Sequence, residues 1–449
     1  MITVPSYQGK KVGVFGLARS GLAAVHSLVA SGAEVFAWDD NEAARGLVES
    51  CAADLYSLDF AELDALMLAP GVPLTHPEPH PLVLKATASN TPLISDFDVF
   101  EAARSSLPKH KVIGVTGTNG KSTTTALIGH ILASCDVPVA VGGNIGTGVM
   151  ALNALPEGGV YVFELSSFQL DLTKHLECNV GVLLNMSPDH LDRHGNMDGY
   201  IAAKKRLFDM QAEGATSIIG VDDEVCAMLA QTLPATIKIS GAMELSDGVS
   251  AVGGTLKGAK CGDIGSLAGI SSLQGTHNWQ NAAAAFAATR AVGVDAKEIL
   301  GAMETFPGLE HRQEIVSHDK GILIVNDSKA TNVDSAVRAL ETFKNIRWIA
   351  GGRAKDKDFS ALANSVQSVR HAYLMGEHAN QIADCLPQSL PLSQLDTLEE
   401  AVHVALGEAE AGDTVLLSPA CTAFDQFANF EKRGEAFKAE VAAVVGARS

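Results

Sequence analysis

Residues 111–125 read KVIGVTGTNGKSTTT, and this stretch decides the fold of the middle of the chain. The short apolar run Val112–Val115 predicts a buried strand, and the run Thr123–Ala133 predicts a helix. A glycine-rich loop, Gly117–Ser122, joins the two. Glycine lets a backbone approach a polyphosphate closely, and the amide groups at the start of the following helix can bind that anion. The stretch therefore predicts a phosphate-binding loop at the carboxyl end of a strand.

Two side chains of this loop suit a nucleotide. Lys121 would reach the outer phosphates, and the Ser122 hydroxyl would bind Mg²⁺. The strict pattern G-x-x-x-x-G-K-[ST] fails at one position, because Val115 stands where the first glycine is required. The alternative is a helix that Ser122 caps after an ordinary glycine turn. The order of strand, Gly-Lys-Ser and helix favours the phosphate loop.

Strand-type and helix-type segments alternate along the rest of the chain. Each apolar run is followed by glycine or polar residues and then by a helical stretch, which is typical of βα units around parallel sheets. This pattern predicts an α/β fold with mostly parallel sheets. The other predicted strands are Val12–Phe15, Glu34–Trp38, Val160–Phe163, Val180–Leu184, Ile322–Val325, Trp348–Ala350 and Val415–Leu417.

Length and local composition divide the chain into three predicted domains. A chain of 449 residues is long enough for about three domains. The polar segment Ala103–Lys111 and a Pro-Gly turn within Thr305–Arg312 mark the boundaries. We therefore expect domains at residues 1–105, 106–305 and 306–449. The Gly- and Ser-rich stretch Ala242–Leu273 predicts hairpins or an excursion from the central sheet.

Composition argues against several classes of protein. With 47% hydrophobic and 19% charged residues, the chain has a globular balance that argues against disorder. Its formal net charge of −19 argues against a surface that grips nucleic acid or an anionic membrane. Met1–Lys10 does not resemble a secretory signal, and no apolar run approaches the ~18–20 residues of a membrane span. The seven scattered cysteines indicate reduced thiols rather than disulfides or a zinc site. We expect a cytoplasmic monomer.

Polar side chains follow two further predicted strands. Glu164 comes directly after Val160–Phe163, where a carboxylate near the phosphate loop can hold a cation. The run Asn185–Gly195, NMSPDHLDRHG, follows Val180–Leu184 and is typical of an active-site loop, although a solvated turn is the alternative. Periodicity alone predicts that Lys204 and Lys205 are exposed helix residues.

The first third of the chain carries a weaker signal. Gly16–Gly21, GLARSG, follows a predicted strand, and Asp39 ends the next one. This G-x-A-x-x-G variant with a later acid fits either a dinucleotide site or a plain βα turn. Ala18 would crowd the closest approach of a pyrophosphate.

Taken together, the motifs resemble the Mur ligase family of ATP-dependent amide-forming enzymes. The resemblance runs through nearly all of the chain, and its order is more specific than any single motif. The segments that carry it are Thr116–Thr123, Glu164–Ser167, Asp189–His194, the context of Lys204, His277-Asn278-x-x-Asn281, and His311-Arg312.

Within the family, the last third resembles the members that add D-glutamate to UDP-N-acetylmuramoyl-L-alanine in peptidoglycan precursor synthesis. The pointers are Asn326–Asn332, Gly351-Gly352 with Lys355, and Leu417–Phe427. Members that add diaminopimelate or lysine would carry an arginine after Asp-Asn-Pro, a motif that this sequence lacks. The alternatives are another Mur ligase, a folylpolyglutamate synthase-like enzyme, or a regulatory module that binds NAD through the first domain.

The resemblance implies a fold and a reaction. The first and last domains would be Rossmann-like, binding the UDP substrate and the amino acid, and the central domain would be a P-loop ATPase. ATP would phosphorylate a substrate carboxylate, the amine of the amino acid would attack the acyl phosphate, and phosphate would leave. All partners would be small molecules, with neither nucleic acid nor membrane involved.

The resemblance also implies roles for individual residues. ATP would bind Gly117, Thr118, Asn119, Gly120, Lys121, Ser122, Thr123, Asn278, Asn281, Arg312 and Asp327. A polar helix cap is the alternative for the two asparagines Asn278 and Asn281. Metal ligands would be Ser122, Glu164, His190 and a carbamylated Lys204 that serves a second Mg²⁺; the catalytic group would be Lys121, Asn144, Glu164, His190 and Lys204.

The substrate residues follow in the same way. D-glutamate would bind Lys329, Thr331, Lys355, Ser418 and Phe424, and the UDP group would bind Leu17, Asp39 and Gly71. One departure stands out: family members often have Asp-Thr-Arg after the second strand, whereas this chain has Asp39-Asp40-Asn41. The contacts to uridine and diphosphate are therefore left open.

Overall fold

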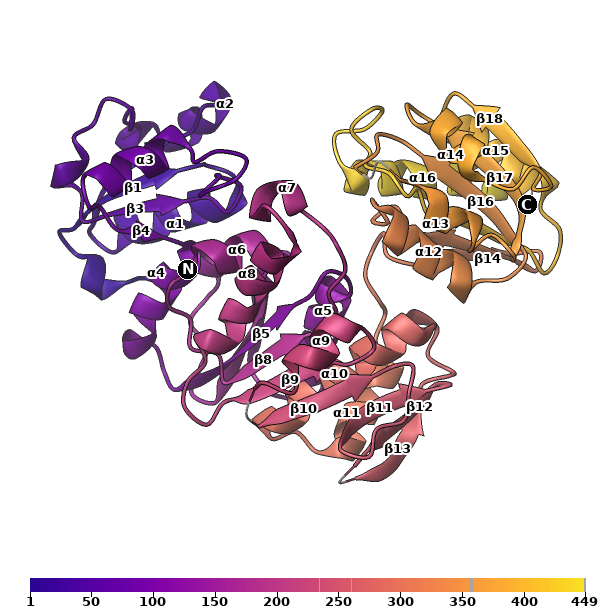
Figure 1. Cartoon of the computed structure of the whole chain (residues 1–449), viewed down its shortest axis with the longest axis horizontal. Helices are drawn as coiled ribbons and strands as arrows, with labels where there is room; N and C mark the ends of the chain where they lie inside the picture. Colours follow the sequence, from indigo (N-terminus) through magenta and orange to yellow (C-terminus); the bar gives the residue numbers. More distant parts are fainter. Residues whose placement is uncertain (234, 260, 356–357, 448–449) are drawn as a thin grey trace. The chain divides into compact units, whose positions relative to one another are not determined.

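The structure, a computed structural model, describes residues 1–233, 235–259, 261–355 and 358–447. The chain forms two compact units (Figure 1). Unit 1 comprises Met1–Ser266 and Asn278–Thr305, and unit 2 comprises Leu267–His277 and the chain from Phe306 onward. The strands of the described residues form three sheets, two in unit 1 and one in unit 2. The predicted α/β fold with mostly parallel sheets is confirmed.

The first sheet has the order β2-β1-β3-β4 and is parallel throughout. Its strands are β1 (Lys11–Phe15), β2 (Glu34–Trp38), β3 (Ala65–Leu68) and β4 (Leu93–Ile94). The helices of this region are α1 (Arg19–Ala30), α2 (Glu42–Arg45), α3 (Pro81–Ala88) and α4 (Asp96–Ala103).

The central sheet has the order β13-β12-β11-β10-β9-β8-β5-β7-β6. Parallel pairing runs from β6 to β11, and antiparallel hairpins of the predicted Gly- and Ser-rich stretch form the other end. The strands are β5 (His110–Thr116), β6 (Val139–Gly143), β7 (Gly159–Glu164), β8 (Val180–Leu183), β9 (Thr216–Gly220), β10 (Thr236–Ser240), β11 (Gly248–Val252), β12 (Thr255–Gly258) and β13 (Gly262–Ser266). The helices are α5 (Lys121–Ser134), α6 (Ser167–Leu172), α7 (Leu191–His194), α8 (Met197–Asp209), α9 (Glu224–Leu229), α10 (Thr276–Val292) and α11 (Ala296–Glu304).

The sheet of unit 2 has the order β14-β15-β19-β16-β17-β18 and is parallel except for the β14–β15 pair. Its strands are β14 (Glu314–Asp319), β15 (Ile322–Asn326), β16 (Ile346–Gly351), β17 (Val369–Met375), β18 (Leu392–Leu395) and β19 (Thr414–Leu417). The helices are α12 (Val333–Thr342), α13 (Ser360–Ala363), α14 (Ala379–Cys385), α15 (Leu398–Glu408) and α16 (Phe430–Ala447). All eight strands predicted from the sequence are present.

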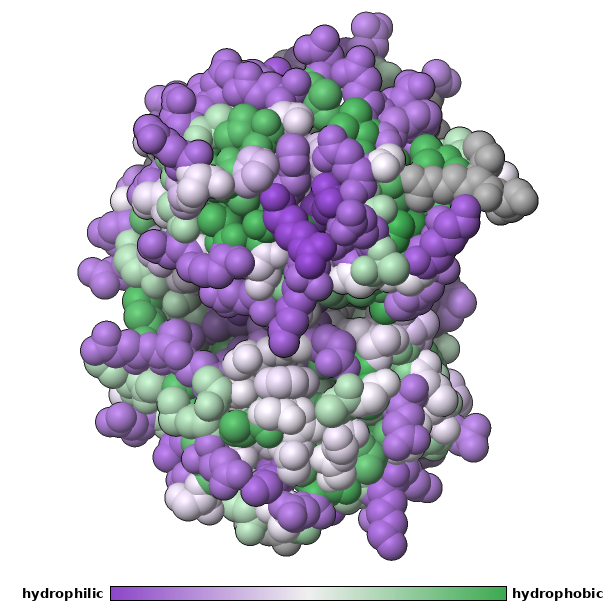
Figure 2. Space-filling view, turned by 90° about the vertical axis from the view of Figure 1, so that its right-hand side faces the viewer, coloured by the Kyte–Doolittle hydropathy of each residue, from purple (hydrophilic) through white to green (hydrophobic). Residues whose placement is uncertain are grey.

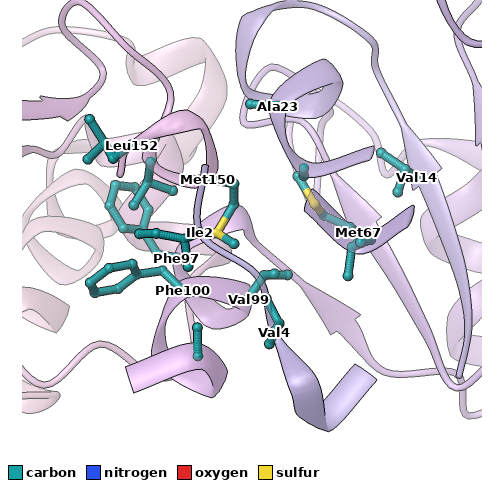
Figure 3. Close-up of a cluster of buried hydrophobic side chains, with 14 of the residues drawn as sticks. Ile2, Val4, Val14, Ala23, Met67, Phe97, Val99, Phe100, Met150 and Leu152 are labelled. Atoms are coloured by element: carbon teal, nitrogen blue, oxygen red, sulfur yellow. The ribbon is translucent and has the colours of Figure 1, made fainter. Parts of the chain in front are cut away.

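One hydrophobic cluster joins the two sheets of unit 1 (Figure 3). Val14 and Met67 contribute to it from the first sheet, and Phe163 contributes from the central sheet. Phe97 and Phe100 of α4 belong to the same cluster, with Phe100 edge-on to Phe163 at 5.0 Å between ring centroids. Burial of shared apolar area accounts for the compactness of unit 1.

The surface agrees with the acidic composition. Hydrophilic side chains cover much of the face drawn in Figure 2 and interrupt the apolar ones. Within the described ranges, no helix has both the length and the apolar character that crossing a membrane requires.

The aromatic cluster gives a stability prediction. Phe100→Ala should lower the free energy of unfolding of unit 1 by about 3–5 kcal/mol, because the fully buried ring would leave a cavity. Urea unfolding of both proteins measures the difference. Leu84→Ala is the control, since that side chain is 56% exposed and its loss should change the value by less than about 0.5 kcal/mol. Equal effects of the two substitutions would contradict the shared core.

Candidate active site

Strand register brings the polar loops of the central sheet to one edge. Strand β5 pairs in parallel with β7 on one side, where Val115 is opposite Glu164, and with β8 on the other, where Thr116 is opposite Leu183. Gly143 at the end of β6 is opposite Glu164 as well. The loops that follow these strands therefore leave the sheet side by side, at the carboxyl ends where open α/β sheets bind ligands.

Backbone amides of the predicted phosphate loop are held by the loop after β8. The Thr118 N–H donates to the Asn185 carbonyl at 2.9 Å, and the Asn119 N–H donates to Asn185 Oδ1 at 2.9 Å. Asn185 is buried, as are Arg193 and His194 further along the same run. The run Asn185–Gly195 is thus buried at its start and at Arg193-His194, while Pro188, Leu191, Asp192 and Gly195 are exposed. Asn185 was not among the residues predicted for the site, although its position directly after a strand was a usable signal.

Position 120 requires glycine, because its backbone conformation and its close neighbours both oppose a side chain. Its φ of 85° lies in the left-handed region that favours glycine. A Cβ added here would lie 2.2 Å from Asn281 Oδ1 of α10. Asn281 Nδ2 in turn donates to Asn278 Oδ1 at 3.2 Å, and both side chains are buried. Because α10 begins at Thr276, Asn281 lies inside the helix and is not a cap.

Lys121 folds back over the loop that it follows. Its Nζ donates to the carbonyls of Gly117 and Thr118 at 2.9 and 2.7 Å. Ser122 and Thr123, in the first turn of α5, are both buried. The helix thus begins at the loop, as the sequence predicted, with its lysine and hydroxyl groups at the edge of the sheet.

Glu164 and Asn144 form a pair at the same edge. Asn144 Nδ2 donates to Glu164 Oε1 at 2.7 Å, and the Asn144 N–H donates to the Glu164 carbonyl at 2.9 Å. Glu164 is 2% exposed. The structure therefore brings together these two predicted site residues, and the carboxylate oxygens are of the kind that Mg²⁺ prefers.

Lys204 corrects the expectation from periodicity, which placed it on the exposed face of its helix. Its side chain is 1% exposed, and Nζ donates to the Gly117 carbonyl at 2.9 Å. Helix α8 packs on β5, so this position faces the sheet. Burial holds the pKa of the Lys204 ammonium well below its ordinary value, and the charge of Lys121 lowers it further. Lys205 is half-buried and pairs with Asp209.

His190 lies beside this group on the loop before α7. Its φ of 54° is left-handed, and its Nε2 is 3.4 Å from Asp189 Oδ2. The imidazole lies against the Phe168 ring, with 4.8 Å between centroids. A neutral ring nitrogen at this position can coordinate a metal ion.

The residues predicted for the UDP group meet at the carboxyl edge of the first sheet. The Leu17 N–H donates to Asp39 Oδ2 at 2.6 Å, which joins the loops after β1 and β2. Gly71 is exposed in the loop after β3. Gly16, with φ of 91°, packs so closely that an added Cβ would lie 2.5 Å from that of Ala69. The first residue of the GxAxxG motif must therefore be glycine because of its close contact with Ala69, whether or not it binds a ligand.

Unit 2 carries the remaining predicted residues, mostly around the ends of β15 and β19. Asp327 Oδ2 accepts a hydrogen bond from Ser418 Oγ at 2.8 Å, and Oδ1 accepts one from the Gln313 N–H at 3.1 Å. Burial raises the pKa of the Asp327 carboxyl to about 7. Lys329 Nζ lies 5.4 Å from the centre of the Phe430 ring.

The other predicted residues of unit 2 are less enclosed. Lys355 and Phe424 are exposed, and Thr331 is half-buried. Arg312 follows His311, whose carbonyl accepts a hydrogen bond from the Lys329 N–H at 2.9 Å. Arg433, which the sequence analysis missed, is buried and donates to the carbonyls of Ser328, Thr422 and Cys421.

The sequence matches two family descriptions. Residues 115–289 match the Mur ligase middle domain, and residues 311–421 match the Mur ligase glutamate ligase domain. A UDP-N-acetylmuramoylalanine–D-glutamate ligase of Phenylobacterium zucineum is 46% identical, over 98% of this chain and 98% of its own. A protein of the same name from Caulobacter vibrioides is 46% identical, over 98% of this chain and 97% of its own.

Solved structures share the fold. The UDP-N-acetylmuramate-alanine ligase MurC of Thermotoga maritima superposes with a TM-score of 0.62 at 18% identity, over 97% of this chain and all of its own. The MurF ligase of the same organism, solved in complex with ADP, gives a TM-score of 0.61 at 16% identity, over 100% of this chain and 98% of its own.

The packing of Gly120 gives a test of the loop. Gly120→Ala should destabilise unit 1 by about 1–3 kcal/mol, because the left-handed backbone and the contact with Asn281 both oppose a Cβ. Thermal unfolding measures the loss. Gly301→Ala in α11, where a Cβ meets no atom within 4 Å, should be neutral or slightly stabilising. A Gly120→Ala protein as stable as the native one would refute the described loop.

Proposed function

The chain belongs to the Mur ligase family, and we propose that it is an ATP-dependent ligase that joins D-glutamate to UDP-N-acetylmuramoyl-L-alanine in peptidoglycan precursor synthesis. Relatives of that name match it at 46% identity over nearly its full length. The observation that carries the proposal is the convergence of the phosphate loop, Asn144, Glu164 and Lys204 at one edge of the central sheet. Because the substrates are ATP and a nucleotide sugar, we propose that the enzyme works in the cytoplasm. We also propose that it is a monomer.

The phosphate loop fits ATP. Gly117 and Gly120 leave room for a close backbone approach, and Lys121 supplies a cation for the β- and γ-phosphates. Asn278 and Asn281 would contact the adenine side, and Arg312 and Asp327 of unit 2 would also bind ATP. Thr118, Asn119 and Thr123 complete the predicted ATP set.

The donor groups fit Mg²⁺. Ser122 and Glu164 would supply oxygen ligands, and His190 would bind beside them. When bound, Mg²⁺ would neutralise charge that develops on the migrating phosphoryl group. Asn144, held by Glu164, would orient the reacting groups.

The environment of Lys204 fits a carbamate. A lysine with a lowered pKa is neutral at a larger fraction of physiological pH, and the neutral amine is the form that attacks CO₂. The new N–C bond gives a carbamate and releases a proton. The resulting anion would replace a buried cation beside Lys121 and would provide oxygens for a second Mg²⁺.

The reaction begins at the carboxylate of the L-alanyl group. This oxygen attacks the γ-phosphorus of ATP, ADP leaves, and an acyl phosphate forms. The neutral amine of D-glutamate then attacks the acyl carbon, phosphate leaves, and the amine loses a proton. Lys121 stabilises the charge on the transferred phosphoryl group.

The two other substrates would bind elsewhere. D-glutamate would meet Lys329, Thr331, Lys355, Ser418 and Phe424, whose lysines suit its carboxylates. The UDP group would bind at Leu17, Asp39 and Gly71, on the first sheet.

The phosphate-loop lysine is tested by substitution. Lys121→Ala should lower kcat at least about a hundredfold, because the migrating phosphoryl loses its cation. Lys111→Ala is the matched control, since Lys111 lies at the other end of β5 and donates to the Val292 carbonyl. Coupled ADP-release assays measure both. Unchanged turnover in Lys121→Ala would refute the assignment.

The carbamate is tested separately. Lys204→Ala should be about a hundredfold slower, while Lys205→Ala should keep native turnover. Native protein prepared without CO₂ should lose activity and recover it with bicarbonate, and ¹³C-bicarbonate should give a carbamate NMR signal that Lys204→Ala lacks. Full activity of Lys204→Ala would overturn the role.

Substrate choice is tested with an amino-acid panel. With UDP-N-acetylmuramoyl-L-alanine and ATP, amide product should form with D-glutamate but not with L-glutamate, L-lysine or meso-diaminopimelate. Product with another amino acid would assign a different Mur ligase activity. Tight NAD binding without any amide product would favour the regulatory alternative.

A further inference from the structure

The packing of α15 against α16 brings three metal-ligating side chains together on unit 2 (Figure 1). Glu399 and His403 come from α15, and Glu440 comes from α16. One carboxylate oxygen of each glutamate and one imidazole nitrogen of the histidine all lie within 4.8 Å of one another. Within the described ranges, no other three histidine, cysteine, aspartate or glutamate side chains converge in this way. The cluster therefore stands apart from the many other carboxylates of this acidic chain.

The spacing on α15 places two of the ligands on the same side of the helix. Glu399 and His403 are four residues apart, and side chains at i and i+4 are neighbours on one helix face. The residues that precede them, Leu398 and Val402, are buried in a hydrophobic cluster of unit 2. The two ligands therefore lie along the flank of the buried face of α15.

Helix α16 presents the third ligand in the same way. Glu440 precedes Val441, and both Val441 and Phe437 are buried in the same hydrophobic cluster as Leu398 and Val402. This shared core fixes the two helix backbones relative to each other. An ion that binds here would have to order only the ends of three side chains, so the entropic cost of binding is small.

The separation of the donor atoms suits a small tetrahedral ion. His403 Nε2 lies 3.4 Å from Glu440 Oε2. Two donors on a tetrahedral zinc ion, with bonds of about 2.0–2.2 Å, are about 3.3–3.6 Å apart, so this pair already has the required spacing. The side chains of His403 and Glu440 are 50% and 29% exposed, which leaves room for water as a fourth ligand.

The charges of the cluster also favour a cation. In the part of the chain that the structure describes, no lysine or arginine forms an ion pair with Glu399 or Glu440. Lys438, in the same turn of α16 as Glu440, pairs instead with Glu310 and Glu314. Two carboxylates at such close range repel each other, and a divalent cation between them would replace this repulsion with attraction.

We propose that Glu399, His403 and Glu440 form a zinc-binding site that clamps α15 to α16. One imidazole nitrogen with two carboxylate oxygens suits Zn²⁺, whereas Mg²⁺ prefers octahedral sites made of oxygen ligands. The site is separate from the Mg²⁺ proposed for catalysis. Glu440 lies about 15 Å along α16 from Phe430, whose carbonyl accepts a hydrogen bond from Ser328 beside the predicted amino-acid residues. The zinc site therefore does not depend on the proposed ligase activity.

Isothermal titration with ZnCl₂ tests the site in the full-length protein, after treatment with a chelator and under reducing conditions. His403→Ala and Glu440→Gln should each weaken one zinc-binding event at least about tenfold, because each removes one of three protein ligands. His318→Ala is the matched control, since this exposed histidine of β14 belongs to the same unit but not to the cluster, and its loss should leave zinc binding unchanged. Excess Mg²⁺ should not displace the zinc ion.

Hydrogen–deuterium exchange tests the clamp. At a zinc concentration about 100 times the dissociation constant, amide exchange in peptides from α15 and α16 should slow by up to about a hundredfold, because zinc binds only when the two helices are packed together. The slowing should be absent in His403→Ala and present in His318→Ala.

Other outcomes would overturn the proposal. Native protein that binds no zinc would do so, as would zinc binding of equal strength in the native, His403→Ala and Glu440→Gln proteins, because the ion would then lie elsewhere on the chain. Displacement of the zinc ion by Mg²⁺ would contradict the assigned metal. Zinc-dependent slowing of exchange that is the same in His403→Ala as in the native protein would refute the clamp.

Discussion

The parallel pairing of β5 with β7 on one side and β8 on the other is the constraint on which the site depends. Because the three strands end together, Glu164 at the end of β7 and the loops that carry Gly117 and Asn185 lie at one edge of the sheet. Helix α8 then packs back against β5 and brings Lys204 to the Gly117 carbonyl. The lowered pKa of this lysine follows from that placement, since the same packing excludes water and sets a second cation nearby.

Local pattern was enough to predict the α/β fold and the start of α5, because apolar runs bounded by glycine and polar residues mark strand ends. The family was predicted from the resemblance of several motifs in order along the chain. The burial of Lys204 could not be predicted from local pattern, since a lysine in a helix is by default expected on the solvent face. Its burial depends on a carbonyl 87 residues earlier in the chain. Asn185 was missed for the same reason, because its partners in the phosphate loop lie 66 residues away. Strand β3, Ala65–Leu68, was not predicted, since ALML holds no β-branched or aromatic residue.

The site residues differ in how far the structure supports their grouping. In unit 1, hydrogen bonds connect Asn144 with Glu164, Lys204 with the phosphate loop, and Leu17 with Asp39. In unit 2, Asp327 and Ser418 are joined, while Lys355 and Phe424 are exposed and their place in an amino-acid site stays a prediction. The predicted boundaries at residues 105 and 305 also stay predictions. Because one hydrophobic cluster includes residues of both sheets of unit 1, the two sheets form one compact unit, and compactness does not separate them at residue 105.

The chain has a net charge of −19, yet the substrates of the proposed reaction are anions. Such substrates can still bind where the hydrogen-bond partners of lysine and arginine side chains are backbone carbonyls rather than carboxylates. A carboxylate partner orients a lysine or arginine but cancels its charge, whereas a backbone carbonyl orients it and leaves the charge in place. Lys121 donates to the carbonyls of Gly117 and Thr118, Arg19 to that of Asn144 and Arg45 to those of Asp39 and Asp40. Local positive potential at a sheet edge therefore does not require a basic protein. It requires only that a few cations be held by the backbone, and an acidic surface elsewhere then costs the site little, because salt screens charges beyond about 8 Å.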